Sequence, residues 1–204
     1  MNNLAVANAL ALNDYALEPL AGAENTLTRV REYASRLPGV DRCLLLLPEG
    51  ADPALPGHGF EVRRVKGEGV DGLLRCLQSA LSEGAYDNLF YFFADCPLLD
   101  PDLSARMLEN HLKYYADYTF ADGYPYGLSP EILKPAVLAP LLELASKTRA
   151  GAGEEPIRPQ DRNGLFELIR KDINAFDIET ELSPVDLRML RAELCADRRA
   201  NLLL

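Results

Sequence analysis

One short apolar run constrains the fold of this chain more than any other stretch. Residues 89–94 read Leu-Phe-Tyr-Phe-Phe-Ala without a polar interruption. The run is too short for a buried helix and fits a strand that is covered on both faces. Asp95 follows at once, and Pro97 lacks the N–H group that a continuing strand needs. We therefore predict a buried strand that ends at Asp95.

The segment after this strand carries the pattern of a helix start. Asp100 can accept hydrogen bonds from backbone N–H groups, Pro101 suits the first turn, and Asp102 favours the positive helix end. Such a strand–loop–helix unit places Asp95 at the carboxyl edge of the sheet, where open α/β folds bind ligands. Asp95 is therefore a candidate metal ligand. The alternative is a carboxylate that accepts hydrogen bonds from nearby loop N–H groups.

Strand and helix patterns alternate along the first half of the chain. The predicted elements are a strand at 4–7, a helix with its apolar face at 27–37, strands at 43–47 and 60–65, a helix with its apolar face at 73–81, and a helix at 101–115. The last helix is expected to bury Leu112 and Tyr115. This alternation indicates an α/β fold with a parallel sheet and helices on both faces.

The second half departs from this regularity, but no composition shift divides the chain. We predict a single domain over residues 1–204 that includes a mobile loop or partner-binding arm at 147–161, a stretch with two Gly, two Pro and six charged residues. The other predicted elements are a strand at 118–120, a helix at 131–146, a helix at 164–173, an extended stretch at 176–178, and a final helix that opens at 183–184.

Composition narrows the class of protein. The net charge of −10 argues against a nucleic-acid-binding surface or a surface for anionic membranes, because both need excess Lys and Arg. The four cysteines are widely spaced without a C-x-x-C pair, which indicates reduced thiols rather than a zinc ribbon or a disulfide framework. No apolar stretch is long enough to span a bilayer. We expect a cytoplasmic protein.

Five motifs follow one another in a family-specific order. They are P-L-A-G at 19–22, K-G-E-G-V-D-G-L-L-R at 66–75, A-D-C-P-L-L-D-P-D-L at 94–103, D-Y at 117–118 with Y-P-Y-G-L-S-P-E at 124–131, and S-P-V-D-L at 183–187. Together they resemble the cytidylyltransferases of surface-sugar biosynthesis, in particular the spore-coat-polysaccharide type. The resemblance implies a three-layer α/β/α fold with a mostly parallel sheet, as in nucleotide-diphospho-sugar transferases.

The resemblance also implies roles for individual residues. In that family the Asp of the third motif, here Asp95, holds the catalytic Mg²⁺. The residues that the resemblance assigns to nucleotide or substrate binding are Lys66, Asp71, Arg75, Tyr124, Gly127 and Glu131. For several of them a structural alternative stays open: solvated cations for Lys and Arg, a favourable helix-end charge for Asp71, and core or interface packing for Tyr124.

Two departures from the family pattern bear on catalysis. The family opens with a Gly-rich loop carrying Arg and Lys, whereas residues 7–17 here contain none of these and include Asp14. The family's second metal-binding Asp is replaced by Leu182. Nucleotidyl transfer depends on a cation that neutralises developing charge and on donors that hold the triphosphate. These departures predict weakened or lost catalysis.

The pattern also resembles the amino-terminal domain of a spirochaete-type radical SAM/SPASM protein. No C-x-x-x-C-x-x-C motif is present, so we expect no iron–sulfur site within this chain. The terminal Leu202-Leu203-Leu204 indicates either leucines that pack on the body or a chain cut from a longer protein with a fused C-terminal domain.

Three hypotheses about function follow. The favoured one is a nucleotidyltransferase-like accessory module of a larger protein, related to CMP-sugar synthesis and binding a nucleotide or nucleotide-sugar. The alternative is an active Mg²⁺-dependent cytidylyltransferase that makes a CMP-activated sugar for surface polysaccharide. The third is a structural module that forms a homodimer through residues 147–161.

Overall fold

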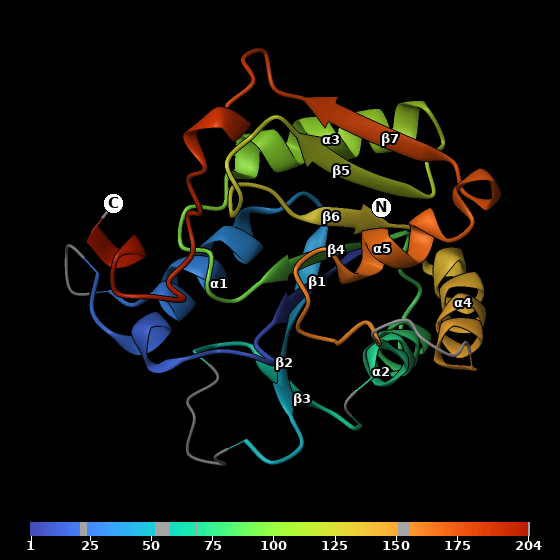
Figure 1. Cartoon of the computed structure of the whole chain (residues 1–204), viewed down its shortest axis with the longest axis horizontal. Helices are drawn as coiled ribbons and strands as arrows, with labels where there is room; N and C mark the ends of the chain where they lie inside the picture. Colours follow the sequence, from blue (N-terminus) through green and yellow to red (C-terminus); the bar gives the residue numbers. More distant parts are fainter. Residues whose placement is uncertain (21–23, 52–57, 68, 151–155, 204) are drawn as a thin grey trace.

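The computed structural model describes residues 1–20, 24–51, 58–67, 69–150 and 156–203. Its centre is a seven-stranded sheet in the order β3-β2-β1-β4-β6-β5-β7 (Figure 1). β6 is antiparallel to its neighbours β4 and β5, and the other adjacent strands are parallel. The strands are β1 (Asn3–Asn8), β2 (Val40–Pro48), β3 (Glu61–Val65), β4 (Asn88–Phe93), β5 (Tyr118–Asp122), β6 (Glu131–Leu133) and β7 (Ile178–Leu182).

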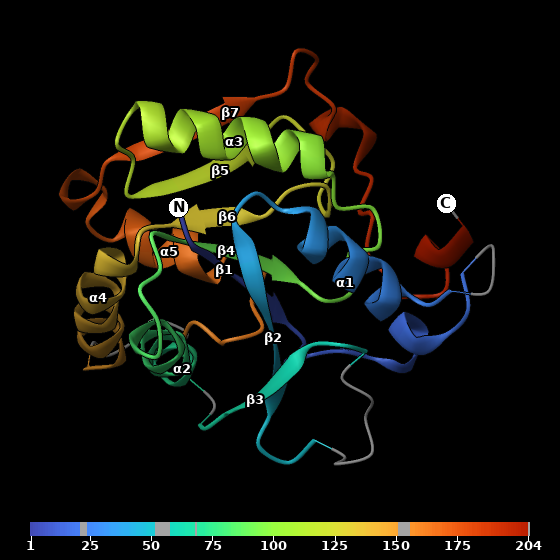
Figure 2. The same cartoon turned by 180° about the vertical axis from the view of Figure 1, so that it is seen from behind.

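Helices cover both faces of the sheet, which confirms the predicted three-layer α/β/α fold. The helices are α1 (Thr26–Arg36), α2 (Val70–Ser82), α3 (Pro101–Lys113), α4 (Leu138–Ala150) and α5 (Gly164–Arg170). α2, α4 and α5 lie on one face, and α1 and α3 lie on the other (Figures 1 and 2). None of the described helices combines the length and apolarity that crossing a membrane requires.

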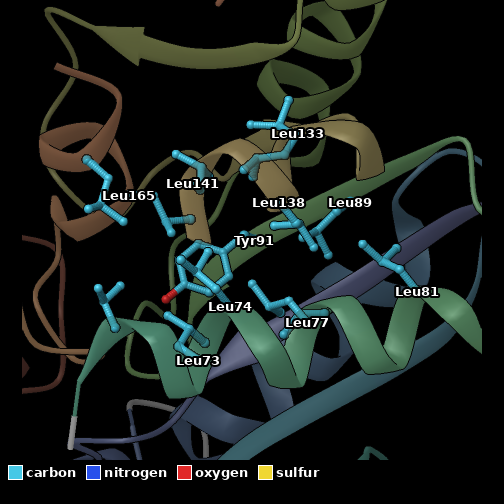
Figure 3. Packing of buried hydrophobic residues seen from close by; sticks show 14 of the residues in the cluster. Leu73, Leu74, Leu77, Leu81, Leu89, Tyr91, Leu133, Leu138, Leu141 and Leu165 are labelled. Carbon is cyan, nitrogen blue, oxygen red and sulfur yellow. The ribbon is translucent and has the colours of Figure 1, made fainter. Parts of the chain in front are cut away.

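The strand β4 lies between β1 and β6 and is buried on both sides, as predicted. Leu89 and Tyr91 pack into the core beneath α2, α4 and α5 (Figure 3). Phe90 and Phe92 pack into the core beneath α1 and α3. Because successive side chains of a strand point to opposite faces, one uninterrupted apolar run supplies both cores.

The helix α3 begins where the sequence predicts. The side chain of Asp100 accepts hydrogen bonds from the N–H groups of Asp102 and Leu103, at 2.8 and 3.1 Å. The end of this helix is predicted wrongly, because it stops at Lys113 and Tyr115 is 78% exposed.

A Schellman-type turn explains the early end of α3. Tyr115 adopts a left-handed φ of 56°, its N–H donates to the Leu112 carbonyl, and the Ala116 N–H donates to the His111 carbonyl. The turn leaves Leu112 exposed and buries His111, whose Nδ1 lies 2.8 Å from the Thr119 hydroxyl. The buried stripe of this helix therefore ends in a histidine.

The predicted helix at 131–146 is wrong in its first part. Residues 131–133 form β6, which pairs with both β4 and β5. A 3-10 turn from Pro135 to Val137 then leads into α4. Short apolar runs fit a buried strand and a buried helix equally well, and the neighbouring strands decided the outcome.

The predicted final helix after Ser183-Pro184 is also wrong. A 3-10 turn from Arg188 to Leu190 is the helical structure described between residues 183 and 194. The Leu187 N–H donates instead to the Gly123 carbonyl at 2.8 Å. Here a backbone N–H group forms its hydrogen bond with the loop after β5 rather than within a helix.

The predicted arm at 147–161 lies only partly within the described residues. Residues 147–150 complete α4, and residues 151–155 lie outside the described part. Residues 156–161 lie against the start of α2, where the Ile157 carbonyl accepts a hydrogen bond from the Val70 N–H at 3.2 Å. Mobility and a role in dimer formation stay predictions.

Candidate functional site

Asp95 lies at the carboxyl end of β4, and Arg162 neutralises its charge. The side chain of Asp95 is 11% exposed, and its carboxylate accepts two hydrogen bonds from the guanidinium, Nη1 to Oδ1 at 3.1 Å and Nη2 to Oδ2 at 2.6 Å. The guanidinium carbon also lies 5.3 Å from the Phe93 ring centroid and 4.9 Å from that of Tyr126. The pair is therefore a bidentate, charge-assisted contact held between two aromatic rings.

The physical environment keeps Arg162 charged. Partial burial lowers its pKa, but the hydrogen bonds and charge of Asp95 outweigh burial and raise the pKa above its already high value. A cation is thus a permanent part of the Asp95 site. Sequence reasoning missed this residue, because it lies 67 positions away in a segment rich in turn residues and charges.

A segment near the C-terminus crosses the same edge of the sheet. We call residues 193–197 the C-terminal strap. The Ala196 N–H donates to the Asp95 carbonyl at 2.7 Å, and the Asn13 side chain donates to the Asp197 carbonyl at 2.7 Å. Figure 1 shows this red part of the chain along the side of the molecule where β4 ends. The strap therefore joins Asp95 to the loop that follows β1.

Two buried thiols meet where the strap crosses the residue after Asp95: Cys195 belongs to the strap and Cys96 to the loop after β4. The Cys96 and Cys195 sulfurs lie 3.6 Å apart, and the four cysteines of the chain are all free. The hydrogen bond with Cys195 and burial both raise the pKa of the Cys96 thiol. The Cys96 thiol therefore packs as a buried apolar group, as expected for buried cysteine.

A large cavity of about 980 Å³ opens at the carboxyl ends of β1, β2 and β3, beside the first turn of α2. Lys66 and Asp71, which the resemblance assigns to nucleotide or substrate binding, line this cavity. Segment 156–160 forms another wall. Its position matches the crevice in which open α/β sheets bind ligands.

A second cavity of about 340 Å³ lies beyond β4, between β5, β6 and α5. We call it the aromatic pocket, because rings make up much of its lining: Tyr91, Phe92, Phe93, Tyr118, Phe120, Tyr124, Tyr126 and Phe166. Gly127, Glu131 and Arg162 also line it. Six of the predicted site residues are thus not in one place: Lys66 and Asp71 line the large cavity, and Tyr124, Gly127 and Glu131 line the aromatic pocket, while Arg75 lines neither and is exposed. Asp95, the predicted metal ligand, is buried and lines neither cavity.

Glu131 is an unusual carboxyl group within the aromatic pocket. Its Oε2 atom is buried and makes no hydrogen bond within the described part of the chain. Burial raises the pKa of Glu131 from 4.5 to about 8, an effect that hydrogen bonding to Tyr118 only partly opposes. The group therefore keeps its proton at neutral pH and can donate a hydrogen bond to a ligand.

We expect Glu131 to make folding stability depend on pH. A folded-state pKa raised to about 8 means that the native state holds the proton more tightly than the unfolded chain. Its contribution is complete below about pH 4.5 and is lost as the pH rises through 8. Glu131→Gln should remove this part of the decline in melting temperature between pH 5 and pH 9. The exposed control Glu143→Gln should keep it, and parallel profiles for all three proteins would contradict the assignment.

The residues around Asp95 do not fit a magnesium ion. Mg²⁺ prefers oxygen ligands, but both Asp95 carboxylate oxygens already accept hydrogen bonds from Arg162. Beside them lie the thiols of Cys96 and Cys195, which are poor ligands for a hard cation. Leu182, in the place of the family's second acid, is 67% exposed and has no ligand atom.

Comparison with solved structures relates this architecture to known proteins. A cytidylyltransferase from Leptospira borgpetersenii superposes with a TM-score of 0.74 at 15% identity, covering 98% of this chain and 82% of that chain. The fold is that of the nucleotidyltransferases. A 4-diphosphocytidyl-2C-methyl-D-erythritol synthase from Anaerococcus prevotii gives a TM-score of 0.65 at 11% identity, over 99% of this chain and 93% of that one.

A CMP:2-keto-3-deoxy-manno-octonic acid synthetase, solved with CTP, gives a TM-score of 0.57 at 13% identity over 94% of this chain and 96% of that one. No protein-family model matches the sequence. Two uncharacterised proteins of Treponema pallidum (strain Nichols) match short stretches, at 43% identity over 54 residues and 49% over 39 residues. These stretches span 24% and 11% of the two Treponema proteins and 26% and 19% of this chain.

Proposed function

We propose that this chain is a nucleotide-binding domain with a nucleotidyltransferase fold, in which nucleotidyl transfer is weakened or lost. It serves as a ligand-binding or accessory module of a larger protein. The observation that carries the proposal is the contrast between the open cavity beside α2 and the Asp95 site, which Arg162 and the C-terminal strap close. CTP, CMP or a CMP-activated sugar is the ligand class, by likeness to the cytidylyltransferases.

The large cavity has the chemistry for a nucleotide. The α2 N-terminus brings its positive helix-end charge to the cavity, which favours phosphate, although its Val70 N–H already donates to the Ile157 carbonyl and the Asp71 carboxylate lies beside the N-cap Gly69. Lys66 and Arg158 add cations, while Val65 and Leu168 offer apolar wall for a base. Its volume lies within the usual range of small-ligand sites.

The loop after β1 supports the loss of transfer chemistry. The Asn8 side chain accepts from the Leu10 N–H at 2.9 Å, and Asp14 opens a 3-10 turn that the Asn13 side chain caps. The N–H groups of Leu10 and Tyr15 in this loop therefore donate to the protein's own side chains rather than to a triphosphate. Nucleotidyl transfer needs a cation that neutralises the charge developing on the phosphate. Because Arg162 occupies Asp95, this carboxylate does not hold a metal ion for that purpose.

We place the sugar part of a ligand in the aromatic pocket. Tyr124 and Gly127 line this pocket with Glu131, and together they match the sugar-side motif of the resembling family. Aromatic rings offer faces for an amphipathic sugar ring, and the protonated Glu131 offers a hydrogen-bond donor.

Calorimetry with CTP and CMP tests the binding proposal. We expect saturable binding with an affinity that changes little when EDTA replaces Mg²⁺. Lys66→Glu should weaken CTP binding about tenfold at low ionic strength, because it reverses a cation at the cavity. The control Lys113→Glu makes the same charge change on α3, in the opposite layer, and should leave binding unaffected. No binding at millimolar CTP would refute the proposal.

An active cytidylyltransferase is the second candidate, because Asp95 keeps its place at the end of β4. A pyrophosphate-release assay with CTP, Mg²⁺ and a panel of acidic and amino sugars separates the two candidates. CTP binding without turnover supports the accessory domain. Turnover that requires Mg²⁺ and disappears in Asp95→Asn establishes the enzyme.

A further inference from the structure

Arg162 lies between two carboxylates. Its Nη2 atom is 2.6 Å from Asp95 Oδ2 and 3.7 Å from Asp197 Oδ2. Asp95 belongs to the end of β4 and Asp197 to the C-terminal strap, so one guanidinium links the sheet edge to the strap. Phe93 and Tyr126 lie against this guanidinium and limit its movement.

We propose that Arg162 is the resident cation of this site, where it takes the part that a divalent ion would otherwise play between Asp95 and Asp197. Removal of the guanidinium leaves two carboxylates facing a common position, which is the donor arrangement that Mn²⁺ or Mg²⁺ uses. The proposal concerns the Asp95 site alone. It does not rest on nucleotide binding in the large cavity, and either can fail without the other.

Electrostatics and geometry both favour the side chain over an ion in the wild-type chain. A divalent ion at Asp95 must displace two charge-assisted hydrogen bonds or sit beside a guanidinium of the same sign. The guanidinium belongs to the chain, so it stays at the site at any metal concentration. The wild-type site is therefore independent of divalent cations, and the strap stays bound in their absence.

The same geometry explains how the site could be converted. The backbone carbonyl of Asp95 accepts a hydrogen bond from the Ala196 N–H. The backbone carbonyl of Asp197, in the strap, accepts one from the Asn13 side chain. Neither of these backbone contacts involves the guanidinium. Both carboxylates should therefore keep their places when Arg162 is shortened to serine.

Titration with Mn²⁺, followed by the electron paramagnetic resonance of the free ion, tests the proposal. Wild type should show no saturable site below about 1 mM. Arg162→Ser should gain one site at least tenfold tighter than any wild-type binding, and Arg162→Ser with Asp95→Asn should lose it. Arg162→Lys keeps a cation and should gain nothing. A plain structural salt bridge predicts no gain of metal binding in any of these variants.

The exposed cluster around Arg188 provides a matched control. Arg188 also pairs with two carboxylates, Asp122 at 3.3 Å and Asp186 at 2.8 Å, but all three side chains are solvated. Arg188→Ser should therefore not gain a site of comparable affinity. Failure of folded Arg162→Ser to bind Mn²⁺ would overturn the proposal. So would a saturable wild-type site that Asp95→Asn abolishes, a result that needs no Arg162 variant to fold.

Discussion

Gly127→Ala should destabilise this protein by about 3 kcal/mol, because two separate costs add at one position. Gly127 has a φ of +95°, a conformation in which a side chain is strained. A Cβ atom there would also lie 2.6 Å from the Leu194 carbonyl oxygen and 3.1 Å from the carbonyl carbon. These are backbone atoms, so the chain leading into the C-terminal strap would have to move. Urea unfolding followed by circular dichroism measures the loss.

Gly67→Ala is the matched control for this prediction. Gly67 has a similar φ of +84°, but a Cβ atom there meets nothing within 4 Å. It should cost about 1 kcal/mol from backbone strain alone. The difference between the two variants isolates the close approach of Leu194. Displacement of this chain should also speed the reaction of Cys96 and Cys195 with a thiol reagent in Gly127→Ala. Equal losses in both variants would show that the approach of Leu194 carries no cost.

Asn8→Asp should also destabilise the protein by about 3 kcal/mol near neutral pH. The buried Asn8 side chain donates to the Tyr91 hydroxyl at 2.6 Å and to the Pro159 carbonyl at 2.8 Å. An ionised Asp has no N–H group, and its carboxylate would face the Pro159 carbonyl without a donor between them. The substitution therefore releases the segment before Arg162 from the end of β1. Thermal unfolding measures the loss of stability. Limited proteolysis in the segment around Pro159 measures its release from the end of β1.

The pH dependence of this variant gives an independent check. Burial beside a carbonyl should raise the pKa of the introduced Asp, so the native state would bind a proton more tightly than the unfolded chain. Asn8→Asp should therefore recover stability relative to wild type as the pH falls. Asn2→Asp makes the same change at a half-buried side chain that donates to the Ala85 carbonyl. It should cost less than 1 kcal/mol, and a similar cost at both positions would contradict the assignment.

Much of the fold follows from local patterns in the sequence. The run at 89–94 predicts a strand covered on both faces, because uninterrupted apolar residues can serve two cores only from an extended chain. The start of α3 follows from Asp100 and Pro101, since capping is a contact between near neighbours in the chain. The same local logic places Asp95 at the carboxyl edge of the sheet.

The two misplaced elements at 131–133 and after Ser183 share one physical cause, which is competition from distant parts of the chain. Residues 131–133 are apolar enough for either element, and pairing with β4 and β5 made them a strand. Residues after Ser183 are released from a helix by backbone bonds to Gly123 and Tyr126. Such contacts carry no signature in the residues nearby.

The sequence by itself determined the layered fold and the position of Asp95. The tertiary structure alone decided what faces that carboxylate. Arg162 and Asp197 reach Asp95 from 67 and 102 positions along the chain, and their approach depends on how two segments cross the sheet edge. Burial then makes the choice of partner decisive, since a carboxylate with little access to water must be neutralised by whatever cation the fold brings to it.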